Sequence, residues 1–207
     1  MYKTEQEKFW AGEFGDKYIL RNKSNIDLAA KIGTFAKILS CIPGGGICSC
    51  LELGSNIGLN LRALNVLIPG IKATAVEINK QAAEICAQIP NVNVVNGSIL
   101  EYQSEEKFDL TFTAGVMIHI NPNELRKVYD VLYNHSNKYI LIAEYYNITP
   151  VEVDYRGNVG RLFKRDFAGE FLDIYKDTEL INYGFAYHRD KNFSMDDITW
   201  FLIKKRD

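Results

Sequence analysis

A glycine turn with an acid on either side is the part of this sequence best suited to do chemistry. In the run LELGSNIG, residues 51–58, Glu52 precedes Gly54, and Gly58 opens a helical pattern. Glycines let the backbone turn tightly and approach a ligand, while the start of a helix presents unpaired amide donors. A second acid, Glu77, lies near the end of the next apolar run. We therefore expect a nucleoside to bind here, with Glu77 accepting hydrogen bonds from the two hydroxyls of a ribose.

Two kinds of cofactor fit a glycine turn that is followed by an acid. A dinucleotide cradle has the pattern G-x-G-x-x-G, whereas this chain carries Asn56 where the central glycine would be. Asparagine tolerates left-handed backbone better than most residues. The carboxylate of Glu52 would repel a pyrophosphate, but it suits the cationic amino-acid end of S-adenosylmethionine, directly or through a water. The residues therefore favour S-adenosylmethionine over a nicotinamide dinucleotide.

The elements that must position these residues alternate along the chain. Helical patterns cover residues 4–13, 24–40, 58–67, 80–88 and 123–134, and short apolar runs predicted as strands cover 47–53, 73–78, 92–95, 108–113 and 139–144. Strands and helices alternating at this spacing predict right-handed βαβ units. They form an α/β fold with a mainly parallel sheet that is covered by helices on both faces.

The two ends of the chain depart from this alternation. The helix over 24–40 is expected to begin at an N-cap of Ser24 or Asn25. Its apolar face is predicted to comprise Leu28, Ala29, Ile32, Phe35, Ala36 and Leu39. Beyond residue 145 the alternation loosens into a polar, aromatic segment, which leads to a helix over 166–174 capped by Asp166. Two closing strands are predicted over 179–188 and 198–204.

Composition excludes several classes of protein. The chain has 207 residues, of which 47% are hydrophobic and 24% charged, and its formal net charge is −2. This mixture can bury a core, so the chain is neither disordered nor collagen-like. Near-neutrality argues against a nucleic-acid binder that neutralises many phosphates. No stretch approaches the roughly 18 consecutive apolar residues of a membrane span, and the charged start MYKTEQEKFW does not have the apolar run expected of a signal peptide. We expect a single cytoplasmic domain.

The cysteines and histidines do not have the spacing of a metal site. The four cysteines contain no C-x-x-C pair, and the three histidines are scattered. Cys48 and Cys50 would share one face of a strand rather than converge on an ion. We expect no metal, and we expect Cys41, Cys48, Cys50 and Cys86 to be buried, reduced thiols.

The motifs resemble those of a known enzyme class. LELGSNIGLNL, the strand end TAVEIN and FDLTFTAGVMIHI are similar to the cofactor motifs of class I S-adenosylmethionine-dependent methyltransferases. FWAGEFGDKYILRN, YRGNVGRLFKRDFAGEFLD, YGFAYHRD and DDITWFL resemble a narrower group, the methyltransferases associated with pseudaminic acid biosynthesis. The resemblance covers nearly the whole chain. It implies a Rossmann-like, mostly parallel seven-stranded sheet with an antiparallel C-terminal strand, S-adenosylmethionine as cofactor and S-adenosylhomocysteine as product.

The resemblance also assigns regions and residues. Residues 1–40 would form a helical lid, 47–145 the cofactor-binding core, and 146–207 the acceptor-side segment with the closing strands. The implied cofactor-binding residues are Glu52, Gly54, Ser55, Asn56, Gly58, Glu77, Ile78, Gly97, Ser98, Ile99, Ala114, Gly115 and Val116. Ser98 stands where many members have the aspartate of Gly-Asp-Leu, which meets the adenine amine. Trp10, Phe14, Tyr18 and Arg21 could cover the cofactor, with Tyr18 and Arg21 binding it, or belong to an amphipathic helix packed on the sheet.

Methyl transfer is an in-line displacement, so the protein mostly aligns an acceptor lone pair with the methyl group. A hydroxyl acceptor needs a general base, whereas an amine must be unprotonated. His119, Tyr145 and Tyr146 follow the fourth and fifth predicted strands and are the candidate catalytic residues. His119 could instead hold its loop, one of the two tyrosines could belong to the core, and the neighbouring Glu144 could be a satisfied buried acid.

Basic residues late in the chain are candidates for binding the acceptor. Arg156, Lys164 and Arg165 could grip a carboxylate or a phosphate, and His188 could lie over the cleft; a solvated loop or strand end is the alternative for each. The resemblance implies a sugar or nucleotide-sugar acceptor of nonulosonic (pseudaminic) acid or surface-glycan biosynthesis. A non-catalytic cofactor-binding or scaffold protein of glycan assembly, and a nicotinamide-dependent oxidoreductase, are the alternatives. The sequence leaves O- and N-methylation both open.

Overall fold

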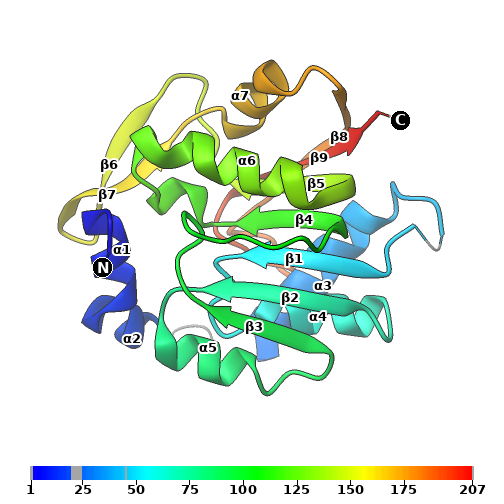
Figure 1. Ribbon diagram of the computed structural model, residues 1–207, viewed down its shortest axis with the longest axis horizontal. Helices are drawn as coiled ribbons and strands as arrows, with labels where there is room; N and C mark the ends of the chain where they lie inside the picture. Colours follow the sequence, from blue (N-terminus) through cyan, green and yellow to red (C-terminus); the bar gives the residue numbers. More distant parts are fainter. Residues whose placement is uncertain (1, 20–24, 45, 207) are drawn as a thin grey trace.

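The protein is built around one large sheet. The computed structural model describes residues 2–19, 25–44 and 46–206 (Figure 1). Its seven-stranded sheet has the order β3-β2-β1-β4-β5-β9-β8. The strands are β1 (Ser49–Leu53), β2 (Lys72–Glu77), β3 (Val92–Asn96), β4 (Phe108–Ala114), β5 (Ser136–Glu144), β8 (Thr178–Ala186) and β9 (Ile198–Lys205). Strands β1 to β5 run parallel, and β9 is antiparallel to both of its neighbours. The predicted mainly parallel, seven-stranded sheet with an antiparallel C-terminal strand is confirmed.

Helices cover both faces of this sheet, as predicted. On one face, α3 (Asn25–Leu39), α4 (Leu59–Leu67) and α5 (Lys80–Cys86) share a core with Cys50, Leu110 and Phe112. On the other face, α6 (Leu125–His135) and α7 (Phe167–Ile174) pack against Leu51 and Leu53. Neighbouring residues of β1 therefore enter different cores, as the period of two in a strand requires. Because β1 to β4 are parallel, their carboxyl ends lie along one edge, where the loops that follow them meet.

The helix predicted over 4–13 is confirmed but ends earlier, and a second short helix that was not predicted follows it. Helix α1 (Glu5–Ala11) ends at Gly12, which has extended backbone, and α2 (Glu13–Ile19) follows. Thr4 and Glu7 form a capping box that fixes where α1 begins. Both helices lie at the carboxyl ends of the parallel strands, near the hairpin described next (Figure 1). The predicted residues Arg21 and Ser24 lie outside the described residues.

A hairpin replaces the irregular segment expected after residue 145. Strands β6 (Val151–Tyr155) and β7 (Asn158–Lys164) pair antiparallel and form a separate two-stranded sheet. Arg156 and Gly157 make the tight turn with positive φ angles of 55° and 79°. The first of these turn positions is usually Asn, Asp or Gly, so an arginine there hides the hairpin in the sequence. The side-chain amide of Gln6 donates to the carbonyl oxygen of Gly160 (2.9 Å), which joins α1 to this hairpin.

Two further expectations need correction. Four residues of the predicted apolar face of α3 are confirmed, because Phe35 is buried and three others pack against the core: Leu28, Ile32 and Leu39. Ala29 and Ala36 are exposed, whereas Ala30 and Ile38, which were not predicted, are buried, so the inward face is shifted from the predicted one. Of the four free cysteines, Cys50 and Cys86 are buried, but Cys41 is half-buried and Cys48 is exposed. Cys48 precedes β1 and shares no strand face with Cys50. None of the helices in the described ranges is long and apolar enough to cross a membrane.

The central strand β4 should dominate stability. Phe112 is fully buried and packs edge-on against Phe35 of α3, with ring centroids 5.7 Å apart. Phe112→Ala is expected to lower the free energy of unfolding by about 3–5 kcal/mol, because it leaves a cavity between sheet and helix. Urea denaturation followed by circular dichroism measures this. Phe185→Ala, the same change at a residue that is 55% exposed on β8, is the control and should cost much less. Equal losses in the two variants would contradict this description of the core.

Candidate functional site

The glycine turn after β1 has the backbone that its sequence predicts. Gly54, Asn56 and Gly58 have positive φ angles of 76°, 49° and 78°. A Cβ atom on Gly54 would lie 2.6 Å from Cγ2 of Val116, and one on Gly58 would collide with Ile89 of the segment after α5. The two glycines are therefore needed because neighbouring elements approach the turn closely. Gly58 packs against protein on this side and does not line the cavity described below.

Glu77 fixes this turn from the end of β2. Its Oε2 accepts the backbone amide of Asn56 (2.7 Å), and its Oε1 accepts the amide of Asn79 (2.7 Å). Burial raises the pKa of Glu77, while these backbone hydrogen bonds act in the opposite direction. A carboxylate has about four lone-pair positions, so each oxygen can still accept another hydrogen bond. Glu77 thus both orders the turn and presents acceptors to a ligand.

Glu52 lies beneath the turn and is fully buried. Its Oε1 accepts the side-chain amide of Asn60 (2.6 Å), and its Oε2 is buried with no hydrogen-bond partner. Burial raises the pKa of Glu52 to about 8, opposed by the hydrogen bond from Asn60 and the charge of Lys31. Glu52 does not line the cavity, but Asn60 and Lys31 do. With this pKa the carboxyl group is mostly protonated at neutral pH, and it does not contact the cavity directly.

A cavity of about 450 Å³ lies at the carboxyl ends of the parallel strands. Its wall is formed by α1 and α2, by α3, by the glycine turn, by the segments after β2, β3 and β4, by Tyr145, by the tip of the hairpin, and by the loop before β9. Among the predicted cofactor-binding residues, those on the wall are Tyr18, Gly54, Ser55, Asn56, Glu77, Ile78, Ser98, Ile99, Ala114, Gly115 and Val116. Gly97 is not on the wall; its amide donates to the carbonyl oxygen of Glu77 (3.0 Å). Trp10 also lines the cavity, whereas Arg21 lies outside the described residues.

The loop after β4 closes the end of the cavity where Gly115 lies. Glu144 is buried, and its carboxylate accepts the amides of Val116 and Met117 (3.1 Å each) and of Ile118 (3.4 Å). Burial raises the pKa of Glu144 to about 7, opposed by these hydrogen bonds. The structure thus favours the reading of Glu144 as a satisfied buried acid that shapes the loop carrying His119.

His119 lies on the wall in a nearly closed setting. Its Nδ1 is 2.6 Å from the carbonyl oxygen of Arg161 on β7, and its ring packs against both Trp10 and Tyr155, at centroid distances of 4.6 and 4.8 Å. Burial lowers the pKa of His119 to about 4, opposed by the hydrogen bond to Arg161. The ring is therefore neutral at pH 7, with the proton on Nδ1 and the lone pair on Nε2. The contact with Arg161 supports the structural alternative, and the catalytic role of His119 stays a prediction.

Tyr145 and Tyr146 point in different directions, as adjacent residues of an extended chain do. Tyr145 is half-buried and lines the cavity, while Tyr146 is 42% exposed. Burial raises the pKa of Tyr145, so that its hydroxyl remains protonated. Both tyrosines line a second cavity.

The second cavity gathers two of the predicted acceptor-binding residues. Lys164 and His188 line it, together with Tyr145, Tyr146, Phe185, Asp196, Asp197 and Thr199. The Lys164 ammonium lies 5.1 Å from the ring centroid of Tyr145, and Nδ1 of His188 is 2.8 Å from Oδ2 of Asp197. Tyr145 and Asp196 also line the first cavity, so the two are neighbours.

The other two predicted acceptor-binding residues separate. Arg156 is exposed at the tip of the hairpin and lines the first cavity. Arg165 lines neither cavity, and its guanidinium is paired with Glu170 of α7 at 2.8 Å.

Sequence reasoning missed the contribution of the helices. Asp27, Lys31 and Thr34 of α3, and Gln6 and Glu7 of α1, all line the first cavity. Burial lowers the pKa of Lys31, opposed by the carboxylates of Glu52, Asp196 and Asp27. The available signal was the run of positions 27, 31, 34 and 38 at helical spacing, which together mark a second face of α3. In the described part of the chain, no group of three or more His, Cys, Asp or Glu could hold a metal ion.

Comparison with solved structures identifies the fold. The plantazolicin methyltransferase BpumL, solved in complex with SAH, matches with a TM-score of 0.67 at 14% identity, covering 98% of this chain and 94% of that one. The magnesium protoporphyrin IX methyltransferase ChlM from Synechocystis PCC 6803, with bound SAH, gives 0.71 at 10% identity, covering 96% and 97%. An amino pentose methyltransferase from Micromonospora echinaspora, solved with bound SAM, gives 0.63 at 12% identity, covering 93% and 96%. No protein-family model and no curated protein matches the sequence. The chain has the Rossmann-like fold of class I methyltransferases.

The buried Glu52 should make stability depend on pH. Its pKa in the folded protein is about 8, above the ordinary value of 4.5, so the folded protein holds a proton that the unfolded chain releases between these values. Stability is therefore lost as the pH rises through this window, on the order of 1.4 kcal/mol for each unit of pKa difference. Glu52→Gln removes the titration, so wild type should lose stability relative to this variant between pH 5 and pH 8 in urea denaturation.

The exposed Glu84 of α5 supplies the control for this measurement. Glu84→Gln should follow the wild-type pH profile. Parallel profiles for wild type and Glu52→Gln would show that Glu52 does not bind the proton in the folded state.

Proposed function

We propose that the protein is an S-adenosylmethionine-dependent methyltransferase acting on a small polar acceptor. One observation carries this proposal: three features of the fold line the same cavity. They are the positive-φ turn after β1, the buried Glu77 at the end of β2, and Gly115 directly after β4. The fold is also that of methyltransferases solved with SAH. The same arrangement argues against a nicotinamide-dependent oxidoreductase, since Asn56 replaces the central glycine of the dinucleotide pattern.

The residues on the wall fit this cofactor. Gly115 has a φ of 71° with no atom within 4 Å of a Cβ placed on it, so the backbone there offers open space where a side chain would intrude. Glu77 keeps free lone pairs for the two ribose hydroxyls. Asp27 and Asp196 on the wall suit the positive charges of the sulfonium and the ammonium, and Lys31 suits the carboxylate. When bound, S-adenosylmethionine supplies an electrophilic methyl group.

His119 and Tyr145 are the residues that would align the acceptor. The neutral His119 ring has a lone pair at Nε2 that can accept a hydrogen bond from an acceptor hydroxyl, while its low pKa makes it a weak base. The Tyr145 hydroxyl can donate to the same acceptor. The protein therefore acts mainly by orientation, holding the acceptor lone pair in line with the methyl group.

The acceptor we propose is a sugar or nucleotide-sugar intermediate of nonulosonic (pseudaminic) acid or surface-glycan biosynthesis. The second cavity supports this, because aromatic faces beside Lys164 and His188 suit a sugar ring that carries a carboxylate or a phosphate. The resemblance of the N- and C-terminal motifs points the same way. The amino pentose methyltransferase is a fold neighbour that acts on a sugar.

Calorimetric titration tests the cofactor. Wild type should bind S-adenosylhomocysteine and should not bind NAD(H). Glu77→Ala should weaken binding by about tenfold or more, because it removes the ribose acceptors and loosens the turn at Asn56. Glu84→Ala, an exposed carboxylate on α5, is the control. Unchanged affinity in Glu77→Ala would refute the ribose assignment, and binding of NAD(H) in place of S-adenosylhomocysteine would refute the proposed function.

A screen of sugars and nucleotide sugars with methyl-labelled cofactor, read by mass spectrometry, tests the acceptor. With the acceptor so found, Lys164→Ala should raise the KM for the acceptor by about tenfold and leave S-adenosylhomocysteine binding unchanged. Lys80→Ala, an exposed lysine of α5, is the control. Failure of every sugar, nucleotide sugar and cell extract to accept the label would favour the non-catalytic scaffold. An equal KM in Lys164→Ala would place the acceptor outside the second cavity.

A further inference from the structure

The nucleoside end of the first cavity has a definite position along the sheet. Strands β1, β2 and β3 are consecutive neighbours, and β4 lies on the other side of β1. With the ribose at Glu77, after β2, and the reacting end at Gly115, after β4, the base must extend past Glu77 toward the segment after β3. Ile78, Ser98, Ile99 and Leu100 line the cavity there.

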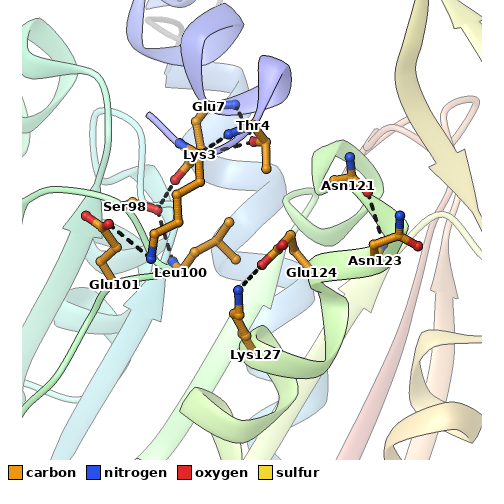
Figure 2. Close-up of polar contacts among 10 residues, drawn as sticks. All are labelled: Lys3, Thr4, Glu7, Ser98, Leu100, Glu101, Asn121, Asn123, Glu124 and Lys127. Carbon is orange, nitrogen blue, oxygen red and sulfur yellow. Dashed lines mark hydrogen bonds and ion pairs between the residues drawn. The ribbon is translucent and has the colours of Figure 1, made fainter. Parts of the chain in front are cut away.

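Helix α1 places a carboxylate at this end. Glu7 lines the cavity and is buried, with 6% of its surface exposed. Its Oε2 accepts the backbone amides of Lys3 (2.6 Å) and Thr4 (2.8 Å), which close the capping box of α1. Its Oε1 accepts the hydroxyl of Ser98, as Figure 2 shows. This last contact joins α1 to the segment after β3.

Ser98 orients the carboxylate and is not free to donate elsewhere. The amide of Leu100 donates to Ser98 Oγ (3.0 Å), and the single hydroxyl proton of Ser98 goes to Glu7 (Figure 2). Burial raises the pKa of Glu7, but the hydrogen bonds from Ser98, Thr4 and Lys3 outweigh it and bring the pKa below its ordinary value. Glu7 is therefore an ionised, acceptor-only group at neutral pH, and Oε1 keeps a lone pair beyond the one that Ser98 uses.

We propose that Glu7 is the residue that recognises the purine, accepting a hydrogen bond at Oε1 from the exocyclic amine of adenine, and that Ser98 positions it. This inference rests on the proposed function. Ile78 and Ile99 supply apolar wall for the rings, and the carboxylate is a polar group that can distinguish one base from another. The amine of a 6-aminopurine donates a hydrogen bond to this carboxylate. A 6-oxopurine would instead place its carbonyl oxygen against the carboxylate oxygen, with no proton between these two acceptors.

Two ligands that differ at this one position test the proposal. Calorimetric titration is done with S-adenosylhomocysteine and with S-inosylhomocysteine, in which a 6-oxo group replaces the amine. Wild type should prefer the adenine form by about tenfold or more, since a charged hydrogen bond is lost with the other. Glu7→Gln should reduce this preference at least about tenfold, because its amide can donate to a 6-oxo group. Ser98→Ala should reduce the preference by a smaller factor.

The design separates recognition from folding and from the proposed function. Each preference is the ratio of two affinities measured on the same folded protein, so a loss of stability cannot change this ratio. Glutamine at position 7 can also still serve in the capping box of α1. Glu5→Gln, the same change at an exposed residue of α1, should keep the wild-type ratio. An unchanged ratio in Glu7→Gln, with S-adenosylhomocysteine still bound by wild type, would overturn this inference alone. Failure of wild type to bind S-adenosylhomocysteine would overturn the proposed function and this inference with it.

Discussion

The hydrogen bond from the Asn56 amide to the Glu77 carboxylate is the contact on which the site depends. It joins the end of β2 to the turn after β1. The backbone conformation of Asn56 is unfavourable for a residue other than glycine, because its φ angle is 49°. The carboxylate must be buried to reach this amide, and burial disfavours its charge. Parallel pairing of β1 with β2 brings the two together, so the geometry of the sheet maintains a local arrangement that neither segment would adopt alone.

Much of the fold could be predicted because its signals are local. Each of β1 to β5 is a short apolar run, and α4, α5 and α6 follow helical spacing, so sheet and layers follow from rules of connection. The errors fall where a single residue decides the outcome. Gly12 ends the first helix short of its predicted end, and Arg156 occupies a turn position where Asn or Gly is usual. The inward face of α3 was misjudged because one side of this helix packs on the sheet while another lines a cavity, which blurs the apolar period.

The candidate site likewise has parts that the sequence predicts and parts that it does not. The glycine turn, Glu77 and the ends of β3 and β4 follow the strands in sequence, so their order alone places them at one edge. Glu7 and Lys31 come from helices far away in the chain, and only the packing of those helices shows that they reach the cavity. The sequence shows Ser98 at the position of the Gly-Asp-Leu aspartate, but it does not show that the carboxylate of Glu7 lies beside this position. Arg165 had the right chemistry, but Glu170 is the partner that its helix provides.

The hairpin anchors two walls of the first cavity through adjacent peptide groups. The carbonyl oxygen of Gly160 accepts the Gln6 side chain of α1, and that of Arg161 accepts the ring N–H of His119 in the loop after β4. Helix α1 and the His119 loop thus share a short stretch of β7 as their support. A displacement of β7 would release both contacts together, so these two walls are expected to move as one unit rather than independently.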